Sequence, residues 1–444
     1  MIRSVKKILK KILPARLFSL YHYLLAIIAS IYYGRPSNKM VIIGITGTKG
    51  KTTAANFVWS CLNAADMPCG LITTANIKIG DHETLNNYHM TMPGRFELQR
   101  LMNKMLEAKC KYCVIETTSE GIKQFRHIGI NYDIVVFTNI YREHLQSHGG
   151  SFERYKEAKS QIFAGLKNSR KKTIDSKPVE KIIFANNDSP YKNFFLGFDA
   201  DKKVTFGLSG EADFYAFNPK DEERGVSFFV NDYQKYHINV DGKFNVPNAL
   251  IAIAICKTLG VSTSNIQKGL EAIEIIPGRM ERIDGGQNFI VYVDYAHQKE
   301  SMESLLESAK DIAATTKGKI IVLLGAEGGG RDKEKRPAMG EAAAKMADFI
   351  IVSNVDPYDD NPAEIINDIV VAAKEHGKEE GKNLFAIQDR RSGIRKAVSL
   401  ARKNDVVLIT GKGSEQSMII GNKTIPWDDR TITREELAKL KNKD

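Results

Sequence analysis

Apolar residues recur along the chain in short continuous runs of the length expected for buried strands. Four such runs in the first half cover residues 41–43, 111–116, 133–139 and 181–186. Segments with helical periodicity, such as 97–108 and 152–166, separate them. Strands that alternate with helices are typical of an α/β domain with a parallel sheet, and we predict that architecture here.

The same alternation of strands and helices resumes in the second half of the chain. Its apolar runs cover residues 289–296, 319–326, 348–354 and 405–410. Residues 203–240 differ, because short alternating runs and turns there predict a β-rich insertion. We therefore expect an N-terminal helical segment over 1–39, a first α/β domain over 40–277 and a second α/β domain over 278–444.

The stretch GITGTKGKTT, which starts at Gly44, joins the first run to a helix predicted over 52–65. It contains Gly50-Lys51-Thr52, although the glycine that the usual phosphate-loop spacing needs at position 45 is an isoleucine. A strand, a glycine turn and a helix N-terminus together direct backbone N–H groups at a phosphate. We expect Lys51 to reach the outer phosphates of a nucleotide and Thr52 to offer its hydroxyl to Mg²⁺.

Polar side chains follow the strands that neighbour this loop. Glu116 ends one run, Asn139 ends the next, and His144 follows shortly after it. Lys159 lies on the next predicted helix. Functional groups in open α/β sheets gather at the carboxyl ends of strands, so we expect a carboxylate, an imidazole and a lysine near the loop.

Composition narrows the class of protein. A length of 444 residues with 43% hydrophobic and 26% charged residues is ordinary for a globular chain of two or three domains. Cys110 and Cys113 form one CxxC pair without a second, so we expect buried thiols in a reducing cytoplasm and no zinc. The net charge of +11 suits acidic small substrates or an anionic membrane surface. No nucleic-acid-binding motif is present, and we expect no such partner.

The first residues combine positive charge with a long apolar run over 17–33. The basic residues before that run are Arg3, Lys6, Lys7, Lys10, Lys11 and Arg16. A membrane span is disfavoured, because positive residues stay cytoplasmic and a span would place Lys51 on the side away from ATP. Two alternatives stay open: a helix in the interface of the inner membrane, giving peripheral contact, or a helix packed on the nucleotide-binding domain.

Short motifs follow one another in order over residues 41–430. They are GTKGKTT from Gly47, ETTSEG from Glu116, TNIYREHLQSHG from Thr138, FNVPNALIA from Phe244, PGRMER from Pro277, VDYAH from Val293, GGGRDKEKRPAMG from Gly328 and GKGSE from Gly411. With these motifs the chain resembles the Mur ligases, and among them the MurE-type UDP-N-acetylmuramyl-tripeptide synthetases. That family has its own phosphate-loop pattern, GTxGKT, which this chain matches.

The resemblance implies a fold and a reaction. The expected fold is a P-loop ATPase central domain with a parallel sheet, followed by a Rossmann-like amino-acid-binding domain. The expected enzyme is an ATP-dependent, ADP-forming acid–amino-acid ligase of peptidoglycan precursor synthesis, which works through an acyl-phosphate. We expect a monomer whose partners are ATP, an amino acid and an acidic sugar-peptide acceptor.

The resemblance also assigns residues to each ligand. The ATP contacts that it implies are Gly47, Thr48, Lys49, Gly50, Lys51, Thr52, Thr53, Asn139, Asn248, Arg279 and Asp294. It implies two Mg²⁺ ions, one at Thr52 and Glu116 and one at His144 and a carbamate formed from CO₂ on Lys159. The acceptor contacts are Thr91, Thr118, Gln124 and Arg126, and the amino-acid contacts are Arg331, Asp356, Tyr358, Gly411 and Glu415. The catalytic set is Lys51, Glu116, His144 and Lys159.

Two departures from the family pattern bear on the substrates. Only 43 residues precede Gly44, so we expect no separate UDP-binding domain, and the head group of the acceptor stays open. Tyr358 stands where the family has an arginine, and a phenol cannot make the charged bidentate contact of a guanidinium. Diaminopimelate is therefore disfavoured, and Asp356, Asp359 and Asp360 favour an amino acid with a cationic side chain.

Two other functions remain open. One is a related ligase with another acceptor, like the folylpolyglutamate or cyanophycin synthetases. The other is a membrane-associated P-loop NTPase without ligase activity, which would release phosphate in the absence of an amine or an acceptor.

Overall fold

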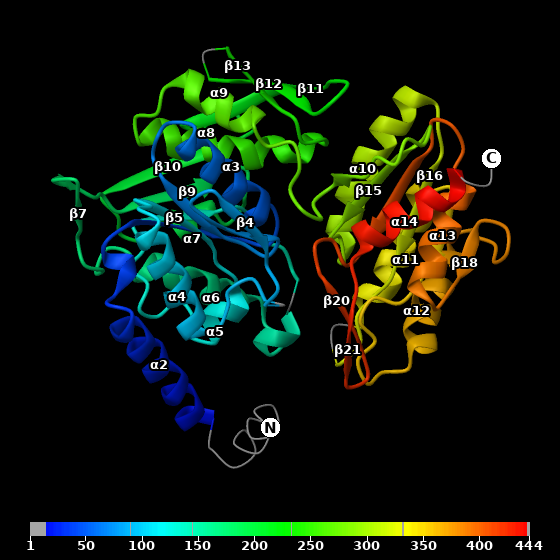
Figure 1. Cartoon of the computed structure of the whole chain (residues 1–444), viewed down its shortest axis with the longest axis horizontal. Coiled ribbons are helices and arrows are strands. Elements are labelled where there is room, and N and C mark those ends of the chain that lie inside the picture. The colour runs from blue at the N-terminus through cyan, green and yellow to red at the C-terminus, as the bar shows by residue number, and fades with distance from the viewer. Residues whose placement is uncertain (1–14, 89, 144, 232, 331–332, 442–444) are drawn as a thin grey trace. The chain divides into compact units, whose positions relative to one another are not determined.

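The computed structural model describes residues 15–88, 90–143, 145–231, 233–330 and 333–441 (Figure 1). The chain forms two compact units. Unit 1 comprises residues 1–219, 227–237 and 246–273, and unit 2 comprises residues 220–226, 238–245 and 274–444.

Unit 1 is built on one large sheet with the strand order β13-β12-β11-β10-β9-β6-β1-β5-β2-β3-β4. The strands are β1 (Val41–Thr46), β2 (Cys69–Ile72), β3 (Asn76–Ile79), β4 (His82–Leu85), β5 (Tyr112–Glu116), β6 (Ile134–Phe137), β9 (Ile182–Asn186), β10 (Lys202–Gly207), β11 (Phe214–Asp221), β12 (Val226–Val230) and β13 (Gln234–Ile238). From β10 through β9, β6, β1 and β5 to β2, each neighbouring pair is parallel. The β-rich character predicted for 203–240 is confirmed, although these strands extend the main sheet.

Helices cover both faces of this sheet. They are α3 (Lys51–Asn63), α4 (Arg95–Glu107), α5 (Ser119–Lys123), α6 (Phe152–Ala164), α7 (Lys192–Leu196), α8 (Val246–Thr258) and α9 (Thr263–Glu271). Figure 1 shows α3 and α8 on one side of the sheet and α4 and α6 on the other. Every residue of β1 is buried, as expected for a central parallel strand between two helical layers.

A buried ionic cluster joins the amino ends of three neighbouring strands in unit 1. Asp133, directly before β6, accepts hydrogen bonds from Lys172 and from Lys181, the latter at 2.9 Å. The same carboxylate accepts the backbone N–H of Ile42 in β1 at 2.8 Å. All three charged side chains are inaccessible to solvent, so buried ion pairs hold this edge of the sheet together.

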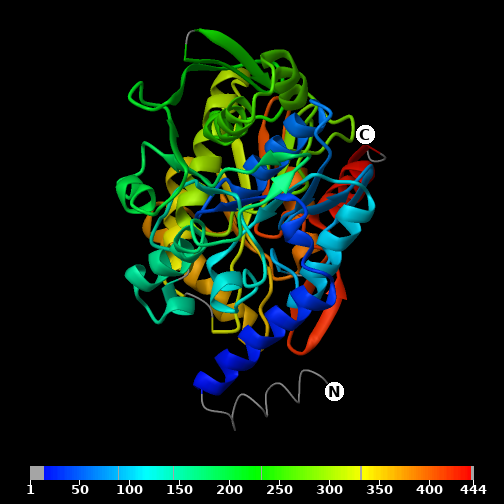
Figure 2. The same cartoon turned by 90° about the vertical axis from the view of Figure 1, so that its left-hand side faces the viewer.

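Helix α2 (Ala15–Tyr32) lies against unit 1 with one face only. Ala26, Ala29 and Ser30 are buried, and the Ser30 hydroxyl donates to the Gly129 carbonyl oxygen at 3.0 Å. On the opposite face, six large side chains are each 47–54% exposed, and we call them the apolar stripe: Leu17, Leu20, Tyr21, Leu24, Ile28 and Ile31. Figures 1 and 2 show the first turns of α2 projecting beyond α4 and α5. Among the described residues, no helix is long and apolar enough to cross a membrane.

Unit 2 has a second sheet with the order β14-β15-β19-β16-β17-β18. Its strands are β14 (Glu281–Arg282), β15 (Ile290–Asp294), β16 (Ile320–Leu324), β17 (Phe349–Val352), β18 (Leu384–Ala386) and β19 (Val406–Thr410), and all neighbours except β14 and β15 are parallel. Its helices are α10 (Lys299–Thr316), α11 (Lys335–Met346), α12 (Pro362–Glu375), α13 (Arg390–Leu400) and α14 (Asp429–Lys441), with a hairpin of β20 (Ser417–Ile420) and β21 (Lys423–Pro426). One apolar core lies under α10, α11 and α12 and another under α13 and α14. The predicted pair of α/β domains with parallel sheets is confirmed.

The prediction of buried thiols is confirmed, because all five cysteines are buried and free. In the described part of the chain, no group of three or more His, Cys, Asp and Glu side chains could hold a metal ion. The CxxC pair at Cys110 and Cys113 is therefore part of the apolar core of unit 1.

Candidate active site

Two glycines hold the phosphate loop against neighbouring elements of unit 1. Gly47 has φ 151°, and a Cβ placed on it would lie 2.0 Å from the hydroxyl oxygen of Thr138. Gly50 has φ 79°, and its Cβ would lie 2.1 Å from the side-chain oxygen of Asn248. No other residue fits either position without displacing these groups. The loop between β1 and α3 is thus held by the end of β6 and the start of α8.

The residues after β6 also bind the loop backbone. Asn139 Oδ1 accepts the N–H of Lys49 at 2.8 Å, and the Asn139 carbonyl accepts the N–H of Thr48 at 2.9 Å. The Thr138 hydroxyl donates to the Lys49 carbonyl at 2.8 Å. The side chains of Asn139 and Asn248 therefore lie beside the loop backbone in this structure, and their contact with adenine stays a prediction.

A hydroxyl, a carboxylate and an ammonium group meet at the mouth of the loop. The Thr52 hydroxyl donates to Glu116 Oε2 at 2.8 Å, and Lys51 Nζ lies 4.0 Å from Glu116 Oε1. Lys51 Nζ also donates to the Thr48 carbonyl at 2.8 Å. Hydroxyl and carboxylate oxygens are the hard ligands that Mg²⁺ prefers, so the residues present fit a nucleotide-bound Mg²⁺.

Lys159, on α6, contacts the backbone of the phosphate loop. Its Nζ is buried, donates to the Gly47 carbonyl at 2.6 Å and lies 4.6 Å from the centre of the Tyr155 ring. The Tyr155 hydroxyl is 3.0 Å from the Thr48 hydroxyl. Burial, together with the positive charge of Lys51, holds the pKa of Lys159 well below its usual range.

A further group lies beside the loop. His144, expected here from the sequence, lies outside the described residues. Glu143, which the sequence analysis did not single out, is buried, and its Oε1 lies 3.9 Å from Lys49 Nζ. Its position beside the expected histidine in the motif TNIYREHLQSHG is the signal that identifies it in the sequence.

Of the four residues expected to contact the acceptor, Thr91 is connected to Glu116 through Thr74. The N–H of Thr74 donates to Glu116 Oε2, and the Thr74 hydroxyl is 2.8 Å from the hydroxyl of Thr91. Thr118 caps α5 by accepting the N–H of Gly121 at 3.1 Å. Gln124 Oε1 accepts a hydrogen bond from Arg126 at 2.6 Å. Nothing in the sequence pattern identifies Thr74, which follows a strand by two residues.

In unit 2, the expected nucleotide-contacting residues lie at the carboxyl end of β15. Asp294 accepts the N–H groups of Met280 and Ala296, each at 2.7 Å, and burial raises the pKa of its carboxyl. The Arg279 guanidinium lies 4.5 Å from the centre of the Tyr295 ring. Asp294 therefore fixes the turn that presents Arg279.

Two of the residues expected to bind the amino acid, Asp356 and Glu415, contact a buried lysine in unit 2. Lys412 Nζ donates to Asp356 Oδ2 at 2.9 Å and also to Glu415. The other Asp356 oxygen accepts the N–H of Ile419 at 2.8 Å. Asp360 lies 3.6 Å from the Arg336 guanidinium. Asp356 and Asp360, which we expected to favour a cationic side chain, are thus already neutralised by cations of the protein itself.

Three other positions were expected to bind the amino acid. Tyr358 has φ 53°, and its ring packs on Gly329, where a Cβ would lie 3.0 Å from the ring. Gly411 directly follows β19, beside Lys412. Arg331 lies outside the described residues. Lys412, the second residue of GKGSE, organises this group, although the sequence analysis assigned it no role.

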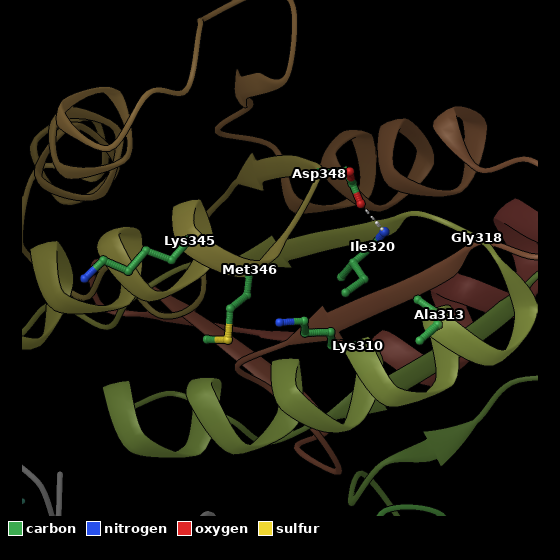
Figure 3. Close-up of a pocket in the computed structure, with 8 residues that line it drawn as sticks. Lys310, Ala313, Gly318, Ile320, Lys345, Met346 and Asp348 are labelled. Atoms are coloured by element: carbon green, nitrogen blue, oxygen red, sulfur yellow. Dashed lines mark hydrogen bonds between the residues drawn. The ribbon is translucent and has the colours of Figure 1, made fainter.

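A hollow of about 270 Å³ in unit 2 lies elsewhere. It is bounded by Lys310 and Gly318 on one side and by Lys345, Met346 and Asp348 on the other (Figure 3). Asp348 accepts the N–H of Ile320, the first residue of β16, at 2.8 Å. The hollow therefore lies at the amino ends of the strands, at the opposite edge from Asp294 and Gly411.

The motifs and their placement agree with known protein families. The Mur ligase middle domain matches residues 45–256, and the Mur ligase glutamate ligase domain matches residues 278–413. A UDP-N-acetylmuramoyl-L-alanyl-D-glutamate--2,6-diaminopimelate ligase 1 of Clostridium acetobutylicum is 36% identical over 424 residues, covering 94% of this chain and 82% of that protein.

The chain belongs to the Mur ligase family.

Other Mur ligases are similarly related to it. The UDP-N-acetylmuramyl-tripeptide synthetase of a Roseiflexus species is 36% identical over 425 residues, covering 94% of this Mur ligase and 82% of its relative. A solved UDP-N-acetylmuramoyl-L-alanyl-D-glutamate--2,6-diaminopimelate ligase has a TM-score of 0.59 at 24% identity, covering 91% of this chain and 79% of that one. The folylpolyglutamate synthase of Mycobacterium tuberculosis with ADP has a TM-score of 0.67 at 17% identity, covering 92% of this chain and 95% of that chain. These structural likenesses establish the fold.

Proposed function

We propose that this Mur ligase is an ATP-dependent, ADP-forming ligase that joins an amino acid to the carboxylate of a sugar-peptide in peptidoglycan precursor synthesis. The observation that carries the proposal is the meeting of Lys51, Thr52 and Glu116 at the mouth of the phosphate loop. The identity to diaminopimelate ligases over nearly the whole chain supports the reaction class.

The reaction has two steps. The acceptor carboxylate attacks the γ-phosphorus of ATP, ADP leaves, and an acyl-phosphate results. The amine of the amino acid then attacks the acyl carbon. The bond from that carbon to the phosphate oxygen breaks, phosphate leaves with the electron pair, and the amine loses a proton. Lys51 stabilises the negative charge that spreads over the transferring phosphoryl group, which is the main requirement of such transfers. Mg²⁺ held by Thr52 and Glu116 would neutralise further phosphate charge.

The proposal gives each unit a part in the reaction. The proposed ATP-binding domain spans residues 40–277 and the proposed amino-acid-binding domain spans residues 278–444, although unit 2 also includes residues 220–226, 238–245 and 274–277. Arg279 and Asp294 would contact the nucleotide, and exclusion of water would protect the acyl-phosphate from hydrolysis.

Lys159 would act as a carbamate. The lowered pKa of this buried amine increases its neutral fraction, and it is the neutral amine that attacks CO₂ to give a carbamate and release a proton. The product is an anionic oxygen ligand for a second Mg²⁺, whereas an ammonium group would repel it. Lys159 Nζ already lies 2.6 Å from the carbonyl of the loop glycine Gly47, so the carbamate would form next to the phosphates.

The amino acid is the least defined substrate. Tyr358 replaces the arginine of diaminopimelate-specific relatives, and Lys412 holds Asp356 and Glu415. We propose that the side chain of the amino acid lacks a distal carboxylate. Lysine fits that description.

Peripheral contact with the inner membrane is part of the proposal for α2. The apolar stripe is half exposed along the whole helix, which contains no acidic residue. The sequence before it carries Arg3, Lys6, Lys7, Lys10 and Lys11 and no acidic residue. An exposed apolar face next to positive charge suits the interface of a membrane with anionic lipid.

One experiment tests the reaction. The purified protein is incubated with ATP, Mg²⁺, UDP-N-acetylmuramoyl-L-alanyl-D-glutamate and each amino acid in turn, and products are followed by mass spectrometry. The expected product has the mass of acceptor plus amino acid minus water, with one ADP for each bond. ADP formation that needs neither acceptor nor amino acid would contradict the proposal and favour an NTPase.

A further inference from the structure

Two buried asparagines of unit 1 pair their side-chain amides between α3 and β3. Asn56 lies in the second turn of α3 and Asn76 is the first residue of β3, and they are 1% and 0% exposed. Asn56 Nδ2 donates to Asn76 Oδ1 at 3.1 Å, and Asn76 Nδ2 donates to Asn56 Oδ1 at 2.9 Å. Local preference and burial both disfavour asparagine inside a helix and in a strand. The contacts that the two amides make therefore explain why they are there.

Asn56 holds the backbone of the first turn of α3. Its Nδ2 also donates to the carbonyl of Thr52 at 3.0 Å, one turn earlier in the helix. Because a carbonyl can only accept, the amide nitrogen of Asn56 faces Thr52, and this fixes the direction of both amides in the pair. The Thr52 hydroxyl donates to Glu116 at 2.8 Å. The pair therefore begins at a residue that fits the nucleotide-bound Mg²⁺.

Asn76 holds the turn on the other side of the pair. Its Oδ1 also accepts the hydroxyl of Thr73 at 2.7 Å, and its backbone N–H donates to the same hydroxyl oxygen at 3.0 Å. Its Nδ2 donates a second hydrogen bond to Glu83 on β4 at 2.6 Å. The amide of Asn76 thus uses two donor and two acceptor positions, which is all that an asparagine side chain offers. This side chain thus ties the turn over residues 73–76 to α3.

These contacts close into a ring, whose members are Thr52, Asn56, Asn76, Thr73, Thr74 and Glu116. On the far side of the ring, the N–H of Thr74 and the hydroxyl of Thr52 donate to the same oxygen of Glu116, both at 2.8 Å. The Thr74 hydroxyl also contacts that of Thr91, which is expected to contact the acceptor. A displacement on the nucleotide side of the ring is therefore passed to the acceptor side.

We propose that Asn56 and Asn76 are positioning residues for the reaction, because they hold Thr74 in place relative to Thr52 and Glu116. Since the ring is closed, a ligand that fixes Glu116 also fixes Thr74 and the acceptor contact beyond it. The pair therefore links the two ligands: Mg²⁺ and nucleotide tighten the binding of the acceptor, and the acceptor tightens their binding by the same factor. The inference rests on the proposed function only in that the second ligand is the sugar-peptide acceptor.

The test measures by calorimetry how tightly the full-length protein binds UDP-N-acetylmuramoyl-L-alanyl-D-glutamate, with and without Mg²⁺ and a non-hydrolysable ATP analogue. In the wild-type protein, Mg²⁺ and the analogue together should tighten binding of this probe by roughly 5- to 150-fold, the usual range of such coupling. The affinity for Mg²⁺ and the analogue should rise by the same factor when the probe is present. Neither measurement requires ligation.

A double variant separates positioning from folding. Asn56→Leu combined with Asn76→Leu replaces both amides by apolar side chains of nearly the same shape, a change that can be close to neutral for stability. The double variant should unfold near the wild-type temperature and bind Mg²⁺ and the analogue as the wild type does, but lose most of the coupling. If it does not fold, Asn56→Ala and Asn76→Ala carry the test. Each should lose the coupling, and together they should lose no more than either alone, because the amides act as one unit.

Asn63 supplies the matched control on the same helix. Its Nδ2 donates to the carbonyl of Trp59, one turn earlier, at 2.8 Å, and its Oδ1 accepts the N–H of Cys69 in β2 at 3.2 Å. It therefore joins α3 to a strand as Asn56 does, but at the end of the helix away from the phosphate loop. Asn63→Ala should lower the thermal stability and leave the coupling unchanged.

The outcomes separate this inference from the proposed function. Equal affinity of the wild-type protein for the probe with and without Mg²⁺ and the analogue would overturn the link, even if ligation occurs. Coupling that survives in the double variant, or that Asn63→Ala also abolishes, would overturn the role of the asparagine pair. Coupling that only the pair variants abolish, in a protein that adds no amino acid to the probe, would support the pair and refute the ligase. A wild-type protein that does not bind the probe would overturn both.

Discussion

The carboxylate of Glu116 accepts hydrogen bonds from the hydroxyl of Thr52 and from the backbone N–H of Thr74 on one oxygen, both at 2.8 Å. Thr52 belongs to the helix that follows the phosphate loop, and Thr74 leads to the acceptor residues. A single carboxylate thus joins the nucleotide side of the site to the acceptor side.

Lys51→Ala should lower the rate of ligation by roughly 10²-fold or more, because it removes a positive group aligned with the transferring phosphoryl group. The measurement is product formation under saturating ATP. Lys177→Ala, on the exposed strand β8 (Lys177–Pro178), removes a lysine from the surface and should leave the rate unchanged. Near-normal turnover of a folded Lys51→Ala protein would refute the assignment of the loop.

Glu116→Gln should raise the Mg²⁺ concentration needed for half-maximal activity by roughly 10-fold or more, because a neutral amide is a poorer Mg²⁺ ligand than a carboxylate. The amide keeps the size of the side chain, so the hydrogen bonds from Thr52 and Thr74 retain an acceptor. Titration of activity with Mg²⁺ at fixed ATP checks this. Glu107→Gln, exposed at the end of α4, is the matched control, and an unchanged Mg²⁺ requirement in Glu116→Gln would place the metal elsewhere.

Lys159→Ala should lose most activity, and acetate or formate should restore part of it by supplying a carboxylate where the carbamate would be. In the wild-type protein, ¹³C-labelled bicarbonate should give a carbamate signal in the NMR spectrum that Lys159→Ala lacks. Lowering the pH protonates the amine and releases CO₂, so the signal should disappear on acidification. Lys171→Ala, an exposed lysine, should keep the signal, and a wild-type protein without it would disprove the carbamate.

Tyr358→Arg should raise the preference for diaminopimelate over lysine by roughly 10-fold or more, because the guanidinium can pair with the distal carboxylate. Competition between the two amino acids in one reaction, with products separated by mass, gives the ratio directly. Tyr358→Phe keeps the ring on Gly329 and should leave the ratio as in the wild type. A ratio that does not move in Tyr358→Arg would show that another residue selects the amino acid.

Replacing Leu20 and Leu24 of the apolar stripe by Glu should reduce co-sedimentation with anionic liposomes by roughly 10-fold or more, because each leucine loses its burial in lipid. Val371→Glu places one negative charge at an exposed apolar position of α12 and should have no effect. Binding that persists at high salt would indicate apolar insertion, since exposed charge contacts are screened. Equal, negligible pelleting of wild type and variant would leave α2 as a helix packed on unit 1.

Local patterns predicted the elements of this fold well. The helix predicted over 52–65 is α3 (Lys51–Asn63), and the segment over 152–166 contains α6 (Phe152–Ala164). In both segments apolar residues recur with helical spacing, and each segment follows a predicted strand. The phosphate loop could be read for the same reason, since a strand, glycines and a helix are contiguous in the chain.

Contacts between distant segments could not be read in this way. The bond from Thr74 to Glu116 joins residues 42 positions apart, and that from Lys412 to Asp356 joins residues 56 apart. Such contacts change the charge that a residue presents to a ligand. The sequence suggests that Asp356 is available to a cationic substrate, whereas in the fold its carboxylate is paired with Lys412.

Because Lys172 and Lys181 share the carboxylate of Asp133, substitutions at the three positions should differ in their effect on stability. Loss of Lys172 or of Lys181 leaves one cation and one anion still paired inside unit 1. Loss of Asp133 leaves two cations facing each other without water, which costs about 3–5 kcal/mol or more in the free energy of unfolding. In a random-mutation library, viable sequences should therefore vary at either lysine well before they vary at the aspartate.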